Sequence, residues 1–282
     1  MSSHFVGKIR AEPAHYGLTS GLLGVLAIII SALSTGSANA QSSDAELAKQ
    51  LANPISSLIS VPFQSNYDCC FGPKDASRYL LNIQPVVPVS LNTDWNLIIR
   101  TILPVISMGS PASTIPSSTG TGDTTQSFFF SPSQTVNGVS WGIGPVFLWP
   151  TGNNVFGSQK WGAGPTAVIL KQESGWTYGI LANHIWSYAG KSGVSDVNST
   201  FLQPFIGYTW PDSTGLFLNS ESSYDWITHE WTIPLNLMLS HVYNIGGQRV
   251  QLQGGVRYYA VRPAGGPDWG ARFNVTFLFP KK

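Results

Sequence analysis

Twelve stretches of the chain are predicted to form β-strands long enough to cross a lipid bilayer, and they constrain the fold more than any other feature. Each combines β-branched and aromatic residues between turn-forming residues. They exceed the roughly 5–6 residues of an ordinary globular strand and match the roughly 9–11 tilted residues that span a bilayer. The predicted strands are residues 57–67, 78–90, 94–107, 126–134, 139–150, 160–173, 175–188, 198–210, 215–226, 230–243, 248–262 and 269–279.

The connections between these strands alternate in length. Asn137-Gly138 and Gly246-Gly247 are strong hairpin signals within the short connections. One rim of tight turns and one of long loops is typical of an outer-membrane barrel, and an even strand count places both ends of the barrel at the tight-turn, periplasmic side. We therefore predict an all-β fold, a closed antiparallel transmembrane β-barrel of about 12 strands over residues 57–282. The short connections are residues 91–93, 135–138, 174, 211–214 and 244–247, and the longest are 68–77, 108–125 and 151–159.

Composition excludes several other classes of protein. Only 10% of residues are charged and 12% are aromatic, whereas a disordered chain is rich in charge and poor in aromatic residues. The two cysteines are adjacent, so they do not form a disulfide framework. The 15 Lys and Arg residues against 14 Asp and Glu leave no basic excess for a nucleic acid.

The first forty residues have the order of a secretory signal peptide. Lys8 and Arg10 precede an apolar run over residues 18–33, and Ala38-Asn39-Ala40 gives a small-residue cleavage site. The alternative is a transmembrane anchor, but this run is shorter than the ~20 residues that a spanning helix needs. We expect residues 1–40 to be removed.

The segment that follows, residues 41–56, contains a short amphipathic pattern. Leu47, Leu51 and Leu58 share roughly one helical face, and Pro54 interrupts the pattern. We expect a helix over residues 44–57, because its apolar face could dock on a partner. The segment is predicted to be either periplasmic or inserted into the barrel lumen.

The ten tryptophans are predicted to lie at strand ends, none in the middle of a strand. A soluble sandwich buries tryptophan centrally, whereas a membrane barrel places aromatic residues in two girdles at the level of the lipid headgroups. We therefore predict two aromatic girdles. Trp95, Trp141, Trp176 and Trp210 lie beside short turns, and Trp149, Trp161, Trp186, Trp226, Trp231 and Trp269 lie beside long loops.

Alternation along the strands separates a lipid-facing side from a lumen-facing side. In the last strand, Phe273 alternates with Arg272 and Asn274. A charge facing lipid at mid-membrane costs ~2–4 kcal/mol, so the arginines are predicted to face the lumen. The predicted lumen residues are Arg100, Arg249, Arg257, Arg272, Glu221 and Asn274.

The charges of these lumen residues allow two interpretations. The arginines are expected to form a basic strip on one wall, with Glu221 outside it, and a fixed positive charge would favour anions. Alternatively, they pair with Glu221, Glu173 or loop acids and leave a neutral passage.

Residues that could carry catalysis or bind a metal show no characteristic spacing. His184, His229 and His241 lie in different predicted strands or at their ends, and no G-x-S-x-G is present. Ser220, Ser222, Asn183 and His184 are the residues that a lipid-acting hydrolase would use. We predict no enzyme activity, no cofactor and no metal site.

Two further local features are assigned structural roles. Cys69 and Cys70 lie in the first predicted long loop, where the pair stabilises the loop or is fortuitous. The sequence Trp-Gly-x-Gly-Pro occurs at Trp141 and again at Trp161, and its glycines are expected to permit curvature or close packing.

Motifs along nearly the whole chain after residue 40 resemble a known family. The chain is similar to outer-membrane proteins labelled "meta-pathway of phenol degradation", which are also called transporters. The resemblance implies a monomeric barrel of about twelve strands that acts as a passive channel, and its label reflects an association with aromatic catabolism. The chain departs from the usual terminal aromatic residue by ending in Phe279-Pro280-Lys281-Lys282. The matching residues are 51–67, Leu81-Asn82-Ile83-Gln84-Pro85-Val86-Val87-Pro88, Trp95-Asn96-Leu97-Ile98-x-Arg100-Thr101, Gly122-Asp123-Thr124-Thr125-Gln126-Ser127-x-Phe129-Phe130-Ser131-Pro132 and Trp141-Gly142-x-Gly144-Pro145.

From the residues and the resemblance together, we predict a channel in the bacterial outer membrane. It would take up small, hydrophobic or aromatic molecules passively, through a polar and mildly basic lumen. Its expected partners are outer-membrane lipid, the small-molecule substrate and the barrel assembly machinery, with no nucleic acid, and the protein is expected to be a monomer. The alternatives are an outer-membrane lipid-acting hydrolase, or a structural or adhesive barrel without transport.

Overall fold

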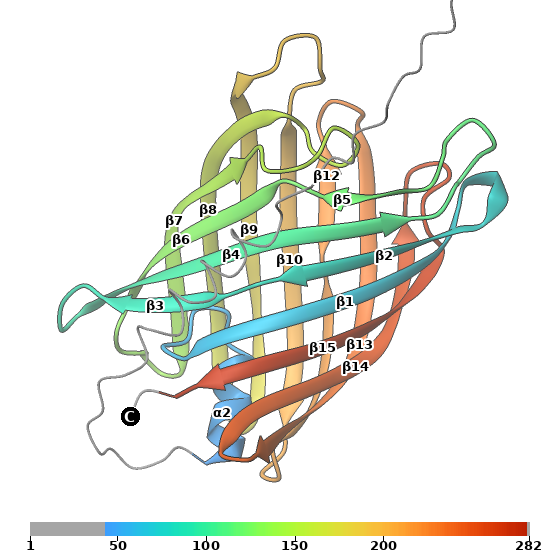
Figure 1. Cartoon of the computed structure of the whole chain (residues 1–282). Helices are drawn as coiled ribbons and strands as arrows, with labels where there is room; N and C mark the ends of the chain where they lie inside the picture. Colours follow the sequence, from blue (N-terminus) through green and yellow to red (C-terminus); the bar gives the residue numbers. More distant parts are fainter. Residues whose placement is uncertain (1–42, 281–282) are drawn as a thin grey trace, which may run out of the picture. The chain divides into compact units, whose positions relative to one another are not determined.

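The strands close on themselves into a barrel, as the sequence predicts. The computed structural model describes residues 43–280, and the predicted signal peptide lies outside them. Fifteen strand segments form the 12 strands of a closed antiparallel barrel (Figure 1). The segments are β1 Ile59–Phe71, β2 Ala76–Ile83, β3 Val86–Ser90, β4 Trp95–Met108, β5 Ser118–Thr121, β6 Thr124–Pro132, β7 Val139–Trp149, β8 Lys160–Glu173, β9 Trp176–Gly190, β10 Asn198–Thr209, β11 Thr214–Ser220, β12 Ser222–Asp225, β13 Glu230–Ile245, β14 Gln248–Val261 and β15 Trp269–Phe279.

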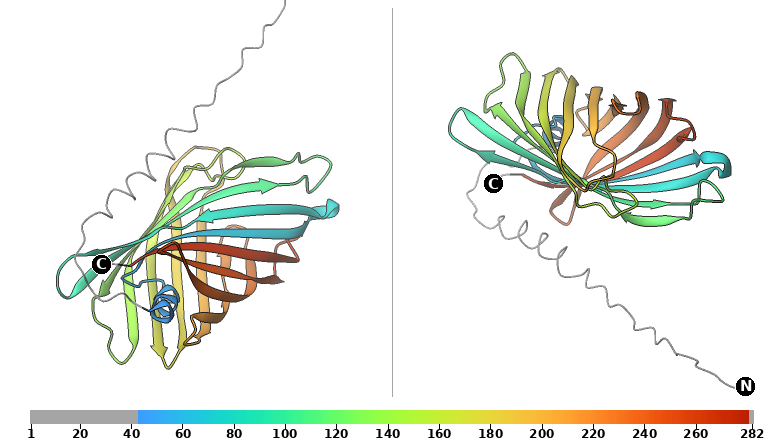
Figure 2. Two further views of the ribbon diagram at one scale, coloured as in Figure 1. Left: turned by 60° about the horizontal axis from the view of Figure 1, so that its bottom comes forward. Right: turned by 90° about the horizontal axis from the view of Figure 1, so that it is seen from above.

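The closure joins the first and last strands. β1 pairs antiparallel with β15 over its length, with Ile59 opposite Phe279 and Cys69 opposite Trp269. Both ends of the barrel chain therefore lie at the same rim, and Figure 2 shows the strands surrounding a common interior. A closed barrel leaves no unpaired edge, which a bilayer would not tolerate. Within residues 43–280, no helix has the length and apolar character needed to cross a bilayer.

The tight turns form as the sequence predicts. In the Asn137-Gly138 and Gly246-Gly247 turns both central residues have positive φ, at 51° and 74° and at 59° and 88°. This is the type I′ geometry that matches the twist of paired strands, and glycine adopts it without strain. Ser174 and Gly175 make a third such turn, with φ of 47° and 85°.

Two predicted loops differ from the structure. Residues 68–77 are mostly strand, because β1 continues to Phe71 and β2 begins at Ala76. An ion pair between Arg78 and Asp68, which are opposite each other, extends this hairpin. The predicted loop 108–125 contains β5, which pairs with β4.

Three of the twelve strands are interrupted, between β2 and β3, between β5 and β6, and between β11 and β12, and proline removes ladder hydrogen bonds at the first and the third break. Pro85 separates β2 from β3, and Glu221 separates β11 from β12. The register with β10 and with β13 is the same on both sides of Glu221, and it places Pro204 opposite Ser220 and Pro234 opposite Glu221. Proline lacks the N–H that a ladder hydrogen bond needs. Both neighbouring strands, β10 and β13, therefore lack a backbone donor opposite the break at Glu221.

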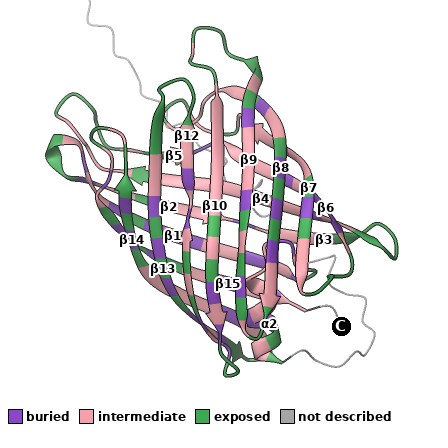
Figure 3. Ribbon diagram, turned by 180° about the vertical axis from the view of Figure 1, so that it is seen from behind, coloured by how far each residue is buried: buried purple, intermediate pink, exposed green. Residues whose placement is uncertain are grey.

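The exterior is apolar and the interior polar along the strands. In β13, Leu235, Leu237 and Leu239 point outward and are exposed, whereas Asn236 and Ser240 are buried. In β15, Phe273 is 51% exposed while the adjacent Arg272 is 4% exposed. Figure 3 shows buried and exposed positions following one another along several strands. Since the exposed side is apolar throughout such strands, it suits hydrocarbon rather than water.

The N-terminal helix is shorter than predicted. α2, Asp44–Leu51, begins at Ser43, whose Oγ accepts a hydrogen bond from the Glu46 N–H. It ends at Ala52, two residues before Pro54, which disfavours helical backbone in the residue before it. The expected helix over residues 44–57 therefore ends early, and the chain reaches β1 through turns.

The two rims of the barrel give a first prediction. We expect the tight turns to face the periplasm, so that Ser192→Cys in the connection 191–197 reacts with a membrane-impermeant maleimide on intact cells. Thr93→Cys, also at an exposed position but in the turn 91–94, should react only after the outer membrane is permeabilised. The reverse labelling pattern would invert the assigned orientation.

Candidate channel lumen

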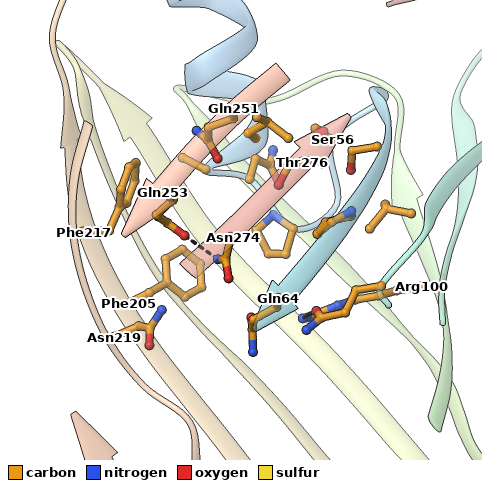
Figure 4. Close-up of a pocket in the computed structure, with 18 of the residues that line it drawn as sticks. Ser56, Gln64, Arg100, Phe205, Phe217, Asn219, Gln251, Gln253, Asn274 and Thr276 are labelled. Carbon is orange, nitrogen blue, oxygen red and sulfur yellow. Dashed lines mark hydrogen bonds between the residues drawn. The ribbon is translucent and has the colours of Figure 1, made fainter. Parts of the chain in front are cut away.

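Inward-facing side chains line an open cavity of about 200 Å3 beside the N-terminal segment (Figure 4). Its lining is dominated by side-chain amides, with one arginine, Arg100, and two phenylalanines, Phe205 and Phe217. The amides are Gln64, Gln84, Gln203, Gln251, Gln253, Asn53, Asn219 and Asn274, and Leu51, Ala52, Pro54 and Ser56 of the N-terminal segment complete one side.

Apolar contacts hold the N-terminal segment against the inner wall. Leu47 packs with Leu58 and with Leu278 of β15, and all three are almost fully buried. Ile55 packs in a second cluster that includes Ile98 and Phe129 of the barrel wall. Burying each such side chain contributes ~1.5–3 kcal/mol, so the segment is anchored at two separate points.

Polar contacts fix the same segment at its helix. Asp44 accepts a hydrogen bond from Arg249 Nε at 2.5 Å in an ion pair. Gln172 Nε2 donates to the carbonyl of Lys49 at 2.8 Å. These partners come from β14 and β8, so the helix is tied to two walls of the barrel near its tight-turn rim (Figure 1).

A second group of contacts, the charged network, connects β1, β2, β14 and β15 with the interrupted strand. Arg272 donates to both carboxylate oxygens of Glu221, at 2.8 and 2.6 Å. Arg272 and Arg257 also both donate to Asn66 Oδ1, at 2.7 and 3.0 Å. Bidentate arginine–carboxylate pairs are among the strongest polar contacts in proteins. The network therefore joins walls that are separated along the sheet.

The buried carboxylate of Asp68 extends this network. Its side chain is fully buried, and it accepts hydrogen bonds from Arg78 at 2.8 Å and from the Tyr259 hydroxyl at 2.9 Å. Gly270 lies opposite both Asp68 and Arg257 in the sheet. A Cβ on Gly270 would lie 2.8 Å from Asp68 Oδ1, so the absence of a side chain leaves room for this carboxylate.

The predicted lumen arginines do not form an open basic strip. Arg249 pairs with Asp44, and Arg257 and Arg272 pair with Glu221. The expectation that Glu221 lies outside the group of arginines is wrong, because its side chain reaches from the break between β11 and β12 to β15. Asn274 faces inward and donates to Gln253 Oε1 at 2.6 Å.

Arg100 differs from the other three arginines. It donates to Gln84 Oε1 at 3.1 Å, and it forms no salt bridge with any residue in the range 43–280. It also lines the cavity, as Figure 4 shows. Arg100 is therefore the predicted lumen arginine that has no bonded carboxylate in the described part of the chain, although Glu221 interacts with its charge electrostatically.

Four members of the charged network are not among the lumen residues that the sequence predicts: Asn66, Asp68, Arg78 and Tyr259. Asp68 lies in a predicted loop, whereas the structure places it in β1. Continued alternation from Gln64 through Asn66 to Asp68 is a signal that could have identified the first two.

The residues considered for hydrolysis are not assembled. Ser220 and Ser222 hydrogen-bond each other at 2.7 Å, and His184 Nδ1 bonds Thr200 Oγ1 at 2.7 Å. In the part of the chain that the structure describes, neither serine hydrogen-bonds a histidine, and no group of three or more His, Cys, Asp or Glu could hold a metal ion.

Two other sequence features have defined places. Cys69 and Cys70 are joined by a disulfide at the end of β1, within the irregularity between Asp68 and Phe71, and not in a loop as predicted. In the repeated Trp-Gly-x-Gly-Pro sequence, a Cβ on Gly144 would lie 1.9 Å from the Phe128 carbonyl oxygen. A backbone approach of the neighbouring strand therefore requires glycine there.

The tryptophans lie near the two rims and contact other aromatic residues. Near the tight-turn rim, the ring centroids of Trp95 and Trp141 are 5.9 Å apart, and those of Trp176 and Tyr208 are 5.1 Å apart. Trp149 and Trp161 are 5.4 Å apart near the opposite rim. Such rows suit the headgroup levels of a bilayer.

Comparisons with known proteins agree with this architecture. No protein-family model matches the sequence, and no curated protein matches it. The structure is similar to that of an outer membrane channel from Pseudomonas putida F1, with 16% identity and a TM-score of 0.61, over 79% of this chain and 94% of that one. It also matches the β domain of the Bordetella autotransporter BrkA, with 8% identity and a TM-score of 0.49, over 79% of this chain and 99% of that one. An outer membrane phospholipase from Salmonella typhi matches with 14% identity and a TM-score of 0.43, over 86% of this chain and 99% of that one.

The fold and the exterior together define the location of the protein. The barrel is closed, its outward side chains are apolar, and its fold is shared with an outer membrane channel. In lipid every backbone polar group must be paired within the protein, and a closed barrel meets that requirement. The chain is a β-barrel protein of the bacterial outer membrane.

The charged network gives a second prediction. Glu221→Gln leaves the buried guanidinium groups of Arg257 and Arg272 without their shared carboxylate, and breaking a buried pair in this way costs about 3 kcal/mol. We expect the free energy of unfolding to fall by that amount in urea titrations of the refolded barrel. Glu173→Gln, which removes an exposed pair with Lys171, should change it by about 0.5 kcal/mol or less. Equal effects of the two substitutions would contradict a stabilising role of the network.

Proposed function

We propose that the protein is a channel for the passive uptake of small, hydrophobic or aromatic molecules across the outer membrane. The observation that carries this proposal is the cavity inside the closed barrel, which combines amides and Arg100 with Phe205 and Phe217. Polar groups let a solute exchange its water contacts for contacts with the wall, while the phenylalanines offer an apolar surface. The fold shared with an outer membrane channel supports the same reading.

The N-terminal segment is proposed to restrict the passage. Leu51, Pro54 and Ser56 line the cavity on one side, so the segment occupies space that a solute would cross. Its anchoring through Leu47 and Ile55 makes it a fixed constriction rather than a free tail. A narrow lumen of this kind selects small molecules over large ones.

The lumen is proposed to be mildly basic, with the selectivity concentrated at one residue. Arg249 pairs with Asp44, whereas Arg257 and Arg272 share the carboxylate of Glu221, so these ion pairs offset part of the positive charge locally. Arg100 has an amide partner instead, and the low dielectric of a protein wall strengthens its field. The protein is proposed to act as a monomer in lipid.

Deletion of the N-terminal segment tests the proposed constriction. Removing residues 41–53 takes away α2 and should raise single-channel conductance in planar bilayers, because the lumen widens. As a control, Lys191→Gln, on an exposed connection away from the segment, should leave conductance unchanged. Unchanged conductance after the deletion would show that the segment does not restrict the passage.

Reversal potentials in a salt gradient test the charge of the lumen. We expect a mild preference for anions that increases at low salt, where screening is weaker. Arg100→Gln should reduce this preference, whereas Lys191→Gln, on an exposed connection, should not. A preference for cations in the unmodified protein would refute the mildly basic lumen.

A further inference from the structure

We infer that the cavity is a binding site for small aromatic monocarboxylates, with the carboxylate at Arg100 and the ring against Phe205 and Phe217. The inference rests on the proposed channel function and specifies the class of molecule that would pause in the lumen. It follows from three features of the cavity: an arginine with unused donors, a lining of amides, and apolar rings on the opposite wall.

Arg100 presents a carboxylate-binding group to the cavity. A guanidinium has five N–H donors in a planar fork, and the structure gives those of Arg100 one side-chain acceptor, Gln84 Oε1. The other three arginines predicted for the lumen have carboxylate partners within the protein. The remaining donors of Arg100 can therefore bind a carboxylate from outside, and the fork geometry favours two parallel hydrogen bonds.

Neighbouring amides can complete the polar half of the site. Gln64 and Gln84 are both more than 90% buried and line the cavity together with Arg100. Gln84 fixes the guanidinium through its carbonyl oxygen. Since amides carry no charge, they contribute hydrogen bonds without cancelling the charge of Arg100.

The apolar half of the site lies on the opposite wall. β4 carries Arg100, and β10 and β11 carry Phe205 and Phe217 from the other side of the barrel. Figure 4 shows the arginine and the two rings on opposite sides of the cavity. A ligand that contacts both walls needs a charged end and an apolar end.

The ring of Phe217 is held in position by two glycines. A Cβ on Gly207 would lie 2.0 Å from this ring, and a Cβ on Gly215 would lie 2.5 Å from it. The ring therefore occupies the space that side chains at these positions would fill. A surface fixed in this way costs little ordering entropy when an aromatic ring packs against it.

The cavity is large enough for one aromatic ring. Its volume is about 200 Å3, and cavities of about 150 Å3 in protein interiors bind benzene. A benzene ring with one carboxylate therefore fits these dimensions.

Binding of sodium benzoate to the refolded full-length barrel tests the inference. Isothermal titration should show saturable binding of benzoate, and benzamide and sodium acetate should each bind about tenfold or more weakly, because one lacks the charge and the other the ring. These comparisons need no substitution. Equal binding of acetate or of benzamide would overturn the assignment.

Substitutions locate the site. Arg100→Gln should weaken benzoate binding about tenfold or more, Arg100→Lys should retain part of it, and Lys191→Gln should leave it unchanged. Phe217→Leu should weaken benzoate binding and leave acetate binding as it was. If Arg100→Gln does not fold, Arg100→Lys and Phe217→Leu still test the assignment of the site. Benzoate affinity that is unaffected by both substitutions would refute this assignment.

Potassium chloride conductance, measured on the same preparation, separates this inference from the proposed function. Ion conductance without benzoate binding overturns the site and leaves the channel in place. Benzoate binding without any conductance overturns the channel and leaves the site.

Discussion

The pairing of β1 with β15 is the interaction on which the rest of the structure depends. It joins strands from opposite ends of the chain and removes the last unpaired edge of the sheet. In hydrocarbon an unpaired backbone group costs several kcal/mol, so a sheet that stayed open would not be stable there. Closure also creates the interior, because the same alternation that turns leucine and phenylalanine outward turns arginine, asparagine and glutamine inward. The polar lumen is thus a consequence of the barrel closure that pairs every strand edge in the membrane.

Inside the barrel, the buried polar side chains also need hydrogen-bond partners. A buried charge is costly unless it is paired and hydrogen-bonded. Glu221, Arg257, Arg272, Asn66 and Asp68 pair with one another across several strands. The N-terminal segment meets the same requirement at the tight-turn rim through Asp44 and Arg249. Between these two groups lies the cavity, whose lining of amides and one arginine is the part of the interior that is polar without a bonded carboxylate.

Prolines remove backbone hydrogen bonds at specific positions in the barrel wall. Pro204 and Pro234 flank the interrupted strand from both sides, at the level from which Glu221 reaches its arginines. The ladder is weakest there, and the strongest side-chain pairing of the lumen begins at the same place. The ion pairs connect the break between β11 and β12 to β14 and β15 across the interior, so they stabilise a region of the wall that has fewer backbone hydrogen bonds.

Local patterns in the sequence predict the strands and the face of the sheet to which each side chain points. The predicted strands 160–173 and 269–279 coincide with β8 and β15, and Arg272 and Asn274 face inward as their alternation with phenylalanine requires. A period of two residues carries this information locally, and hairpin turns fix the neighbours. The contacts between inward residues across the lumen depend on how the whole barrel closes. Glu221 with Arg272, and Asp44 with Arg249, are pairs of residues far apart in the chain, and their contacts depend on strand stagger and barrel closure, which no local pattern of residues encodes.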